Sequence, residues 1–250
     1  MRLAALQFRP QKAFPDASRD VLQKLIREAA AEGSDVIVCP EMATCGYVWP
    51  DAETLRPFAE ESTGPTYQML SSEAKEANAW IVCGFPERAG ESLYNSAMVI
   101  APDGSLQAVY RKILLFDADC SWAQAGTDRV YVEQIEGGLA PAICMDLNDD
   151  GLLLWLEEKQ PSIVAFCTNW LEEQIPVHYY WSWRLQRYSG WFVAANSWGT
   201  DGKTEFCGQS AIFGPGGVLL AAAPRTGDGI VIADAPEHAL LSSAYPAEGQ

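Results

Sequence analysis

The chain alternates between short apolar runs and longer segments in which apolar residues recur with helical spacing. The short runs, bounded by Gly, Pro, Asn or Asp, predict buried β-strands. They lie at 2–8, 35–39, 80–84, 94–100, 106–110, 130–132, 139–143, 162–167, 191–196, 208–213, 218–222 and 229–233. The helical spacing predicts helices at 16–31, 66–77, 150–159 and 177–189.

These elements repeat along the chain as two halves, each running strand, helix, strand, helix, strand and hairpin. The hairpin turns are Pro102-Asp103-Gly104 and Pro215-Gly216-Gly217. Helices between strands indicate an α/β fold, and the hairpins indicate mixed sheets. One helix layer per sheet leaves each sheet with one free apolar face, and stacking the sheets buries both faces. We therefore predict a four-layer α-β-β-α sandwich, formed by one domain at 1–235 with a loose C-terminal tail at 236–250.

Composition narrows the class of protein. The chain has 250 residues, 48% of them hydrophobic, which is enough for one substantial core. A formal net charge of −16 and a pI near 4.4 disfavour binding to nucleic acid or to an anionic membrane, because phosphate would be repelled. Seven cysteines without a CxxC pair, and only two histidines, disfavour a zinc site and a disulfide framework. With no signal peptide or long apolar span in the sequence, we expect a cytoplasmic protein.

The segment 142–148 combines a buried strand, a sharp turn and a helix start, with Asn148 or Asp149 as the N-cap. Cys144 stands at the turn. A thiolate held there can attack a carbonyl carbon, and backbone N–H groups of the turn can hold the resulting oxyanion. The alternative is a buried structural cysteine, which is the commoner role of a free cysteine.

Two further ionisable residues follow predicted strands: Glu41 after 35–39 and Lys112 after 106–110. Reactive residues collect at the carboxyl ends of strands in α/β folds. Glu41 can take the thiol proton and return it to a leaving amine, and Lys112 can stabilise the oxyanion. This set predicts acyl transfer from an amide through a thioester on Cys144. The alternatives are solvated charges at the strand ends, or a Cys–His dyad of Cys144 with His178.

The segments Pro40-Glu41, Tyr110-Arg111-Lys112 and Ile143-Cys144-Met145-Asp146 resemble, in order and spacing, the signature segments of the nitrilase, or carbon–nitrogen hydrolase, superfamily. Asn95-Ser96-Ala97, Asn169-Trp170 and the segments 192–196 and 208–217 agree with it. The resemblance covers residues 2–234. It implies the four-layer sandwich, a Glu41–Lys112–Cys144 triad, no metal or organic cofactor, and pairing through the sheets into a homodimer or larger homo-oligomer.

Within the superfamily, the segments around Lys112 and Cys144 are similar to the protein N-terminal amidases, which deamidate N-terminal Asn or Gln. This implies a small amide or a peptide N-terminus as the substrate. An N-carbamoyl hydrolase, a nitrilase and a non-catalytic binding protein on the same fold are the alternatives.

Many members of the superfamily carry a second glutamate after the lysine, and here Asp119 is favoured over Asp117 for that position. Asp119 and Met145 are expected to support the triad, and either aspartate can receive a substrate ammonium group. Loop residues that follow strand ends are expected to contact the substrate. They are Tyr47, Trp49, Trp122, Asn169 and Trp170.

Overall fold

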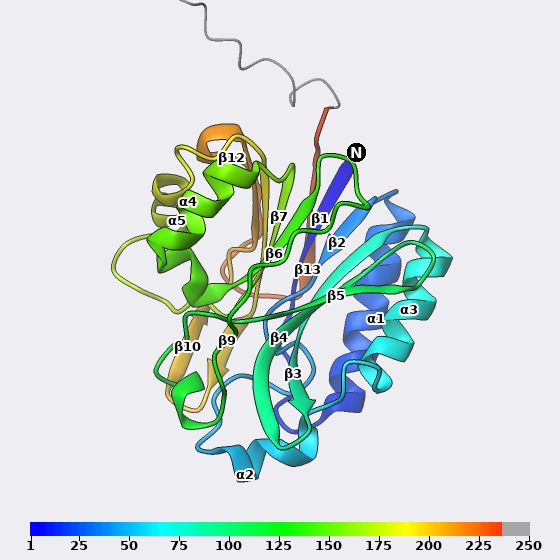
Figure 1. Ribbon diagram of the computed structural model, residues 1–250, viewed down its shortest axis with the longest axis vertical. Coiled ribbons are helices and arrows are strands. Elements are labelled where there is room, and N and C mark those ends of the chain that lie inside the picture. Colours follow the sequence, from blue (N-terminus) through cyan, green and yellow to red (C-terminus); the bar gives the residue numbers. More distant parts are fainter. Residues whose placement is uncertain (237–250) are drawn as a thin grey trace, which may run out of the picture.

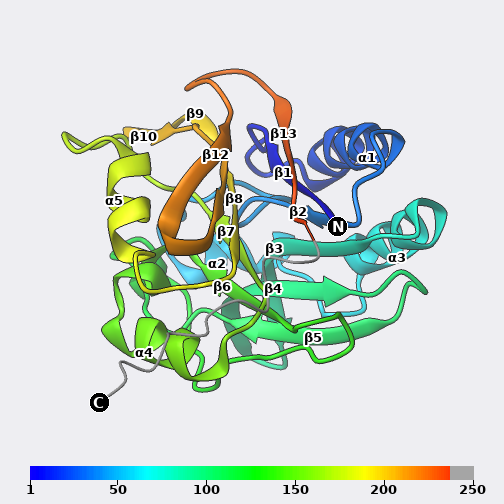
Figure 2. The same ribbon diagram turned by 90° about the horizontal axis from the view of Figure 1, so that it is seen from above.

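The computed structural model describes residues 1–236, which form two mixed β-sheets packed face to face between two layers of helices (Figure 1, Figure 2). The first sheet has the order β13-β1-β2-β3-β4-β5. Its strands are β1 (Arg2–Gln7), β2 (Val36–Val38), β3 (Trp80–Ala89), β4 (Ser92–Ile100), β5 (Leu106–Arg111) and β13 (Gly229–Asp234). The second sheet has the order β12-β11-β8-β7-β6. Its strands are β6 (Leu139–Ile143), β7 (Ile163–Thr168), β8 (Trp191–Asn196), β11 (Ala211–Gly214) and β12 (Val218–Ala222).

The long helices cover the outer faces, α1 (Pro15–Ala31) and α3 (Pro65–Ala77) on the first sheet, α4 (Asp150–Lys159) and α5 (Val177–Arg184) on the second (Figure 2). This confirms the predicted four-layer sandwich. The neighbours β1, β2 and β3 are parallel, as are β6, β7 and β8, while the hairpins add antiparallel strands. The predicted tail at 236–250 lies, apart from its first residue, outside the described residues.

The strands β1 to β4 of the first sheet are largely buried on both faces because one face meets the second sheet and the other meets α1 and α3. In β1, Leu3 and Ala5 pack in the core between the sheets, whereas Ala4 and Leu6 pack under the helices. The same alternation in β2 places Ile37 on the helix side. A strand covered on both faces reads as an unbroken apolar run, which is why these strands could be predicted from the sequence.

Helix ends follow local sequence signals. α1 begins with Pro15, whose missing N–H is tolerated in the first turn. α3 ends at Asn78 in a left-handed conformation. Asp149, one of the two predicted N-caps, caps α4 by accepting a hydrogen bond from the Gly151 N–H at 2.8 Å.

Several predicted boundaries were wrong. The segment 130–132 forms only one bridge, from Val132 to Leu139, and not a strand. The predicted helix 177–189 ends at Arg184, because Tyr188 turns inward and donates its hydroxyl to the Pro161 carbonyl at 2.7 Å. The predicted strand 208–213 begins only at Ala211.

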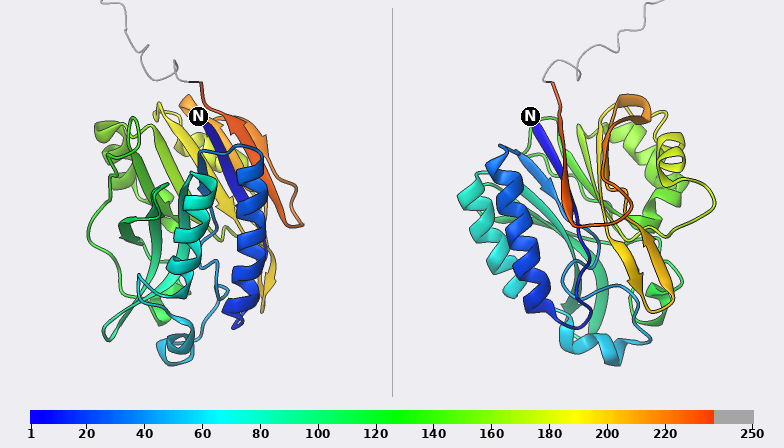
Figure 3. Two further views of the ribbon diagram at one scale, coloured as in Figure 1. Left: turned by 90° about the vertical axis from the view of Figure 1, so that its right-hand side faces the viewer. Right: turned by 180° about the vertical axis from the view of Figure 1, so that it is seen from behind.

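The structure also contains elements that the pattern did not predict. A polar hairpin of β9 (Trp198–Asp201) and β10 (Thr204–Cys207) projects beyond the second sheet (Figure 1). β13 returns from the second half and pairs antiparallel with β1 in the first sheet (Figure 3). The remaining short helices are α2 (Ala52–Leu55) and the 3-10 turns Arg56–Phe58, Asp119–Ser121, Cys144–Asn148 and Pro215–Gly217. Within residues 1–236, no helix is both long and apolar enough to cross a lipid bilayer.

Candidate active site

Three strand ends from the two sheets bring Glu41, Lys112 and Cys144 together, as predicted. Glu41 follows β2, Lys112 follows β5, and Cys144 follows β6 directly. The Lys112 Nζ lies 2.8 Å from the Glu41 Oε1, and both side chains are completely buried. The charges of Glu41 and Lys112 both act on the pKa of the Cys144 thiol, as expected for close neighbours. The predicted alternative of solvated charges at the ends of β2 and β5 is therefore wrong.

Lys112 stands between two carboxylates. Its Nζ donates to Asp119 Oδ2 at 2.6 Å as well as to Glu41. Asn95 Nδ2 bridges the same two carboxylates, at 2.7 Å from Glu41 Oε1 and 3.1 Å from Asp119 Oδ1. Burial lowers the pKa of Lys112, but the neighbouring Glu41, Tyr47 and Asp119 outweigh it, with Glu41 contributing most, and the pKa is raised well above its ordinary value. Lys112 therefore remains an ammonium group at neutral pH, and two of its three N–H donors are used.

Glu41 has one engaged and one free carboxylate oxygen. The Oε2 atom is buried and has no hydrogen-bond partner among the described residues. Burial raises the pKa of Glu41, with a smaller upward contribution from Asp119, and the attraction of Lys112 only partly opposes this. The Asn169 amide holds the backbone of Glu41 by donating to its carbonyl oxygen at 2.9 Å. A buried carboxylate with a raised pKa and one free oxygen is suited to accept a proton.

Cys144 occupies the turn between β6 and the helical segment that leads to α4. Its φ of 40° lies in the left-handed region, which is uncommon for a non-glycine residue and frequent at functional sites. Burial, and then the negative charge of Glu41, raise the pKa of the thiol, against a smaller lowering contribution from the positive charge of Lys112. With burial and Glu41 outweighing Lys112, Cys144 is a neutral thiol in the free protein and needs a base to become a nucleophile.

Asp146 ties the cysteine turn to the lysine segment. One carboxylate oxygen accepts from the backbone N–H groups of Ile113 and Leu114 at 3.1 and 2.9 Å. The other accepts from the Tyr110 hydroxyl at 2.7 Å and from the Ile143 N–H at 2.9 Å. Because Asp146 is buried, these four bonds fix the end of β6 against the segment after β5. This role, and the bridge made by Asn95, were not foreseen from the sequence.

A small pocket of about 50 Å³ opens beside Cys144. Of the residues predicted to contact the substrate or support the triad, Tyr47, Met145, Asn169 and Trp170 line it. Trp122 is instead buried in an apolar cluster that also contains Tyr47 and Trp49. Sequence reasoning missed Phe116, Asn148 and Glu173, which complete the wall together with Leu171.

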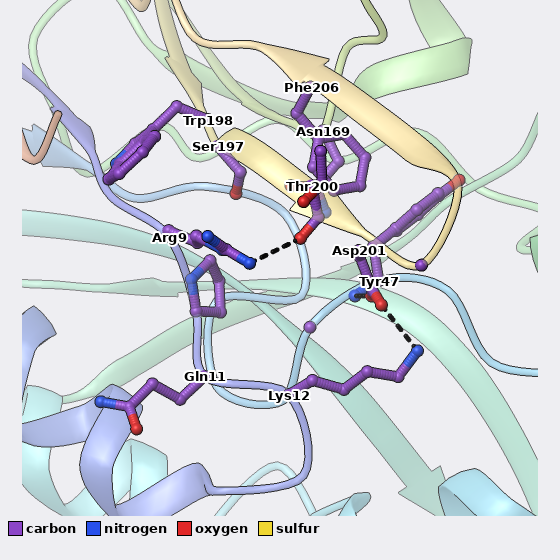
Figure 4. A pocket seen from close by; sticks show the side chains of 13 residues that line it. Arg9, Gln11, Lys12, Tyr47, Asn169, Ser197, Trp198, Thr200, Asp201 and Phe206 are labelled. Atoms are coloured by element: carbon purple, nitrogen blue, oxygen red, sulfur yellow. Dashed lines mark hydrogen bonds and ion pairs between the residues drawn. The ribbon is translucent and has the colours of Figure 1, made fainter. Parts of the chain in front are cut away.

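A larger cleft of about 450 Å³ shares Tyr47 and Asn169 with this pocket (Figure 4). Its remaining walls come from the loop after β1 and from the β9–β10 hairpin. The predicted Cys–His dyad receives no support, because His178 is absent from both linings and its Nε2 lies 2.8 Å from the Gln209 carbonyl oxygen.

The expectation that Asp119 or Asp117 receives a substrate ammonium group is wrong. Asp119 is completely buried, and both of its oxygens are engaged, Oδ2 with Lys112 Nζ and the Phe116 N–H and Oδ1 with Asn95. Asp117 is exposed and lines neither cavity. Asp119 does occupy the supporting position predicted for it, beside the lysine. Within residues 1–236, no group of three or more His, Cys, Asp or Glu side chains is arranged to hold a metal ion.

Comparison with known proteins agrees with this geometry. The profile of the carbon-nitrogen hydrolase family matches residues 2–240. A probable nitrilase of Schizosaccharomyces pombe is 30% identical over 79% of this chain and 74% of its own length. The protein N-terminal amidase of the same yeast is 27% identical over 85% of this chain and 90% of its own. The solved structure of a Nesterenkonia sp. AN1 amidase in complex with butyramide has the same fold, with a TM-score of 0.84 at 19% identity, covering 96% of this chain and 92% of that one.

Proposed function

The chain belongs to the carbon–nitrogen hydrolase family of the nitrilase superfamily, and on that premise we propose that it hydrolyses a small primary amide. Catalysis by this family depends on a cysteine. In our proposal Cys144 forms a thioester with the acyl group, and ammonia leaves. Glu41 and Lys112 are the other two catalytic residues, and Asp119 and Asn95 position them.

One observation carries this proposal: the buried Glu41 Oε2 has no hydrogen-bond partner among the described residues and belongs to a carboxylate whose charge acts on the Cys144 thiol. A buried polar atom is normally paired, so a free carboxylate oxygen in this place needs an explanation. Accepting the thiol proton provides one. The raised pKa of Glu41 strengthens it as a base, while the contact with Lys112 keeps an ionised form accessible.

The first half-reaction follows from these contacts. Glu41 Oε2 takes the proton from Cys144 Sγ as the sulfur attacks the amide carbon. The negative charge that develops on the amide oxygen is stabilised by the third N–H donor of Lys112 and by backbone N–H groups of the cysteine turn. Glu41 then returns the proton to the departing nitrogen, the C–N bond breaks, and ammonia is released. The product is an acyl thioester on Cys144.

The second half-reaction regenerates the thiol. Glu41 removes a proton from a water molecule, whose oxygen attacks the thioester carbon and forms a second tetrahedral oxyanion. Collapse of this intermediate breaks the C–S bond, and the proton held by Glu41 returns to the sulfur. The acid product leaves, and the charges of the site are unchanged over the cycle.

The test is ammonia release from a panel of small aliphatic amides, Asn- and Gln-leading peptides, N-carbamoyl compounds and aliphatic nitriles. We expect small amides such as butyramide to react faster than nitriles. Cys144→Ala should reduce turnover to background, and Glu41→Gln should reduce kcat by about 10²- to 10⁴-fold, the range for loss of a general base. The matched control is Cys120→Ala, which changes an exposed cysteine. Activity of Cys144→Ala within tenfold of wild type would show that the assignment of the nucleophile is wrong.

We also propose that the protein forms a homodimer through the α4 and α5 layer, in support of the expected homo-oligomer. Large apolar side chains on this surface are exposed, with Tyr179, Trp183 and Leu154 at 76%, 57% and 64% of their full areas. Exposed apolar patches of this kind mark interaction surfaces. Sedimentation of the wild type and of Trp183→Glu measures this, and a wild-type monomer at micromolar concentration contradicts it.

A further inference from the structure

The larger cleft beside the Cys144 pocket carries an unusual charge for this protein. It lies between the loop after β1, which supplies Arg9 and Lys12, and the β9–β10 hairpin, which supplies Asp201 (Figure 4). Tyr47 and Asn169 line both the cleft and the pocket, so the two spaces are neighbours. A substrate whose amide reaches Cys144 would pass Tyr47 and Asn169 to extend into the cleft.

The charges of the cleft do not cancel. Lys12 Nζ pairs with Asp201 Oδ1 at 2.8 Å, and the other Asp201 oxygen accepts the backbone N–H groups of Tyr47 and Val48. Arg9, by contrast, has no ion-pair partner within residues 1–236, and its guanidinium donates only to the Thr200 carbonyl at 2.9 Å. The cleft thus holds one unbalanced cation in a protein with a net charge of −16.

A second, independent feature of the cleft is an unsatisfied hydroxyl group. Ser197 is 1% exposed, and its Oγ has no hydrogen-bond partner in the described part of the chain. The side chain points into the cleft on the same side as Arg9 (Figure 4). A buried hydroxyl without a partner destabilises a protein unless a ligand or water pairs with it. An oxygen acceptor bound by Arg9 would pair with it.

We propose that this cleft binds a carboxylate at the far end of the substrate, so that the preferred substrates are monoamides of dicarboxylic acids. The inference rests on the proposed amide hydrolysis and specifies its substrate class. Arginine presents paired donors that match the two oxygens of a carboxylate, and Ser197 adds a hydroxyl donor. Within the cleft, a substrate ammonium group would instead meet the unbalanced Arg9 and be repelled. The recognised charge is thus opposite to the one expected from the similarity to N-terminal amidases.

The test compares kcat/KM for succinamate, glutaramate and adipamate, which are monoamides of increasing length, with that for neutral butyramide. We expect at least one monoamide to exceed butyramide by tenfold or more. Arg9→Gln should lower this ratio about tenfold or more through KM, which is the scale for losing a charge-assisted hydrogen bond. The ratio for Arg9→Lys should lie between those of Arg9→Gln and wild type, because lysine keeps the positive charge but lacks the paired donors of the guanidinium group. Arg88→Gln, at an exposed arginine outside the cleft, is the matched control and should leave the ratio unchanged.

Ser197→Ala provides a second test that does not depend on the fold tolerating a change at Arg9. The hydroxyl has no hydrogen-bond partner within the described residues, so the variant should be at least as stable as wild type, yet its monoamide-to-butyramide ratio should fall. Equal ratios in wild type and Arg9→Gln, or a preference for Asn- and Gln-leading peptides over every monoamide, would overturn the cleft assignment. Butyramide hydrolysis would then still support the proposed function.

If no amide is hydrolysed, the proposed function is wrong. Carboxylate binding in the cleft is then tested without turnover. Calorimetric titration of glutarate into the Cys144→Ala protein should show saturable binding that Arg9→Gln weakens about tenfold or more. Absence of binding at millimolar glutarate would refute the carboxylate site.

Discussion

The four hydrogen bonds accepted by Asp146 predict the effect of replacing it with asparagine. Asp146→Asn has almost the same shape but presents an NH₂ group in place of one carboxylate oxygen. Every partner of Asp146 is a donor: the N–H groups of Ile113, Leu114 and Ile143, and the Tyr110 hydroxyl. Only the tyrosine hydroxyl can turn and become an acceptor.

The new side-chain amide of Asp146→Asn can take two orientations, and the less costly one sets the size of the destabilisation. If the new NH₂ group faces Ile113 and Leu114, two buried N–H donors lose their acceptor. If it faces Tyr110 and Ile143, only the Ile143 N–H is left unpaired, which costs about 1–3 kcal/mol. Losing the carboxylate weakens the remaining hydrogen bonds, but it also removes the penalty of burying a charge. The pKa of Asp146 is raised, mainly by burial, which shows that its hydrogen bonds do not fully compensate this penalty. The two changes oppose each other, so we expect a net destabilisation of about 2 kcal/mol, set by the unpaired N–H.

The effect of Asp146→Asn on activity follows from where the hydrogen-bond partners of Asp146 lie in the chain. Ile143 precedes Cys144, and Ile113 and Leu114 follow Lys112, so loosening this clamp moves the nucleophile relative to its oxyanion donor. Misplacement by about 1 Å can reduce a rate about 10²-fold. We therefore expect kcat to fall by one to two orders of magnitude in Asp146→Asn, about 10- to 10²-fold.

Urea denaturation followed by tryptophan fluorescence measures the free energy of unfolding, and ammonia release measures kcat. The matched control is Asp150→Asn, whose side chain is 85% exposed and pairs with Arg184 at the surface. The control should change stability by less than about 0.5 kcal/mol. If Asp146→Asn behaves like this control in both assays, the clamp is not what positions Cys144 and the reasoning is refuted.

Further predictions concern the buried charges. Lys112→Met leaves the Glu41 and Asp119 carboxylates buried without a cation, so it should destabilise the fold by about 3–5 kcal/mol in urea denaturation and reduce kcat at least about 10²-fold. A variant with normal kcat would rule out Lys112 as an oxyanion donor. Because Glu41 must be ionised to act as a base and its pKa is raised, kcat/KM should decline as the pH falls through a value above the pKa of an ordinary glutamate. Asp119→Asn should move this acidic limb to lower pH, since the Asp119 charge contributes to raising the pKa of Glu41. A limb that stays in place or moves upward contradicts this coupling.

Residues at the ends of regular strands could be predicted from the sequence, whereas residues brought together by the β9–β10 hairpin could not. β2 and β6 are continuous apolar runs, and β5 follows a clear hairpin turn and has an apolar stretch at 108–110, so these signals locate the strand ends and, with them, Glu41, Lys112 and Cys144. The β9–β10 hairpin is polar and half exposed, and its Asp201-Gly202 turn was the only signal that could have revealed it. Arg9 and Ser197 gain their meaning from that hairpin, so no interpretation of separate segments could have joined them.

Asp119 shows a different limit of prediction from sequence. The sequence places an acid near the lysine, but it cannot show whether the carboxylate oxygens are free or engaged. In the structure Lys112, Asn95 and the Phe116 N–H use both oxygens, so the acid that seemed available to a substrate ammonium serves only to hold the lysine. In the neighbouring cleft the guanidinium of Arg9 has no ion-pair partner among the described residues, and the structure provides it from a loop far away in sequence. Counting charges near a nucleophile is therefore insufficient, because substrate recognition depends on the charges that the fold leaves unpaired.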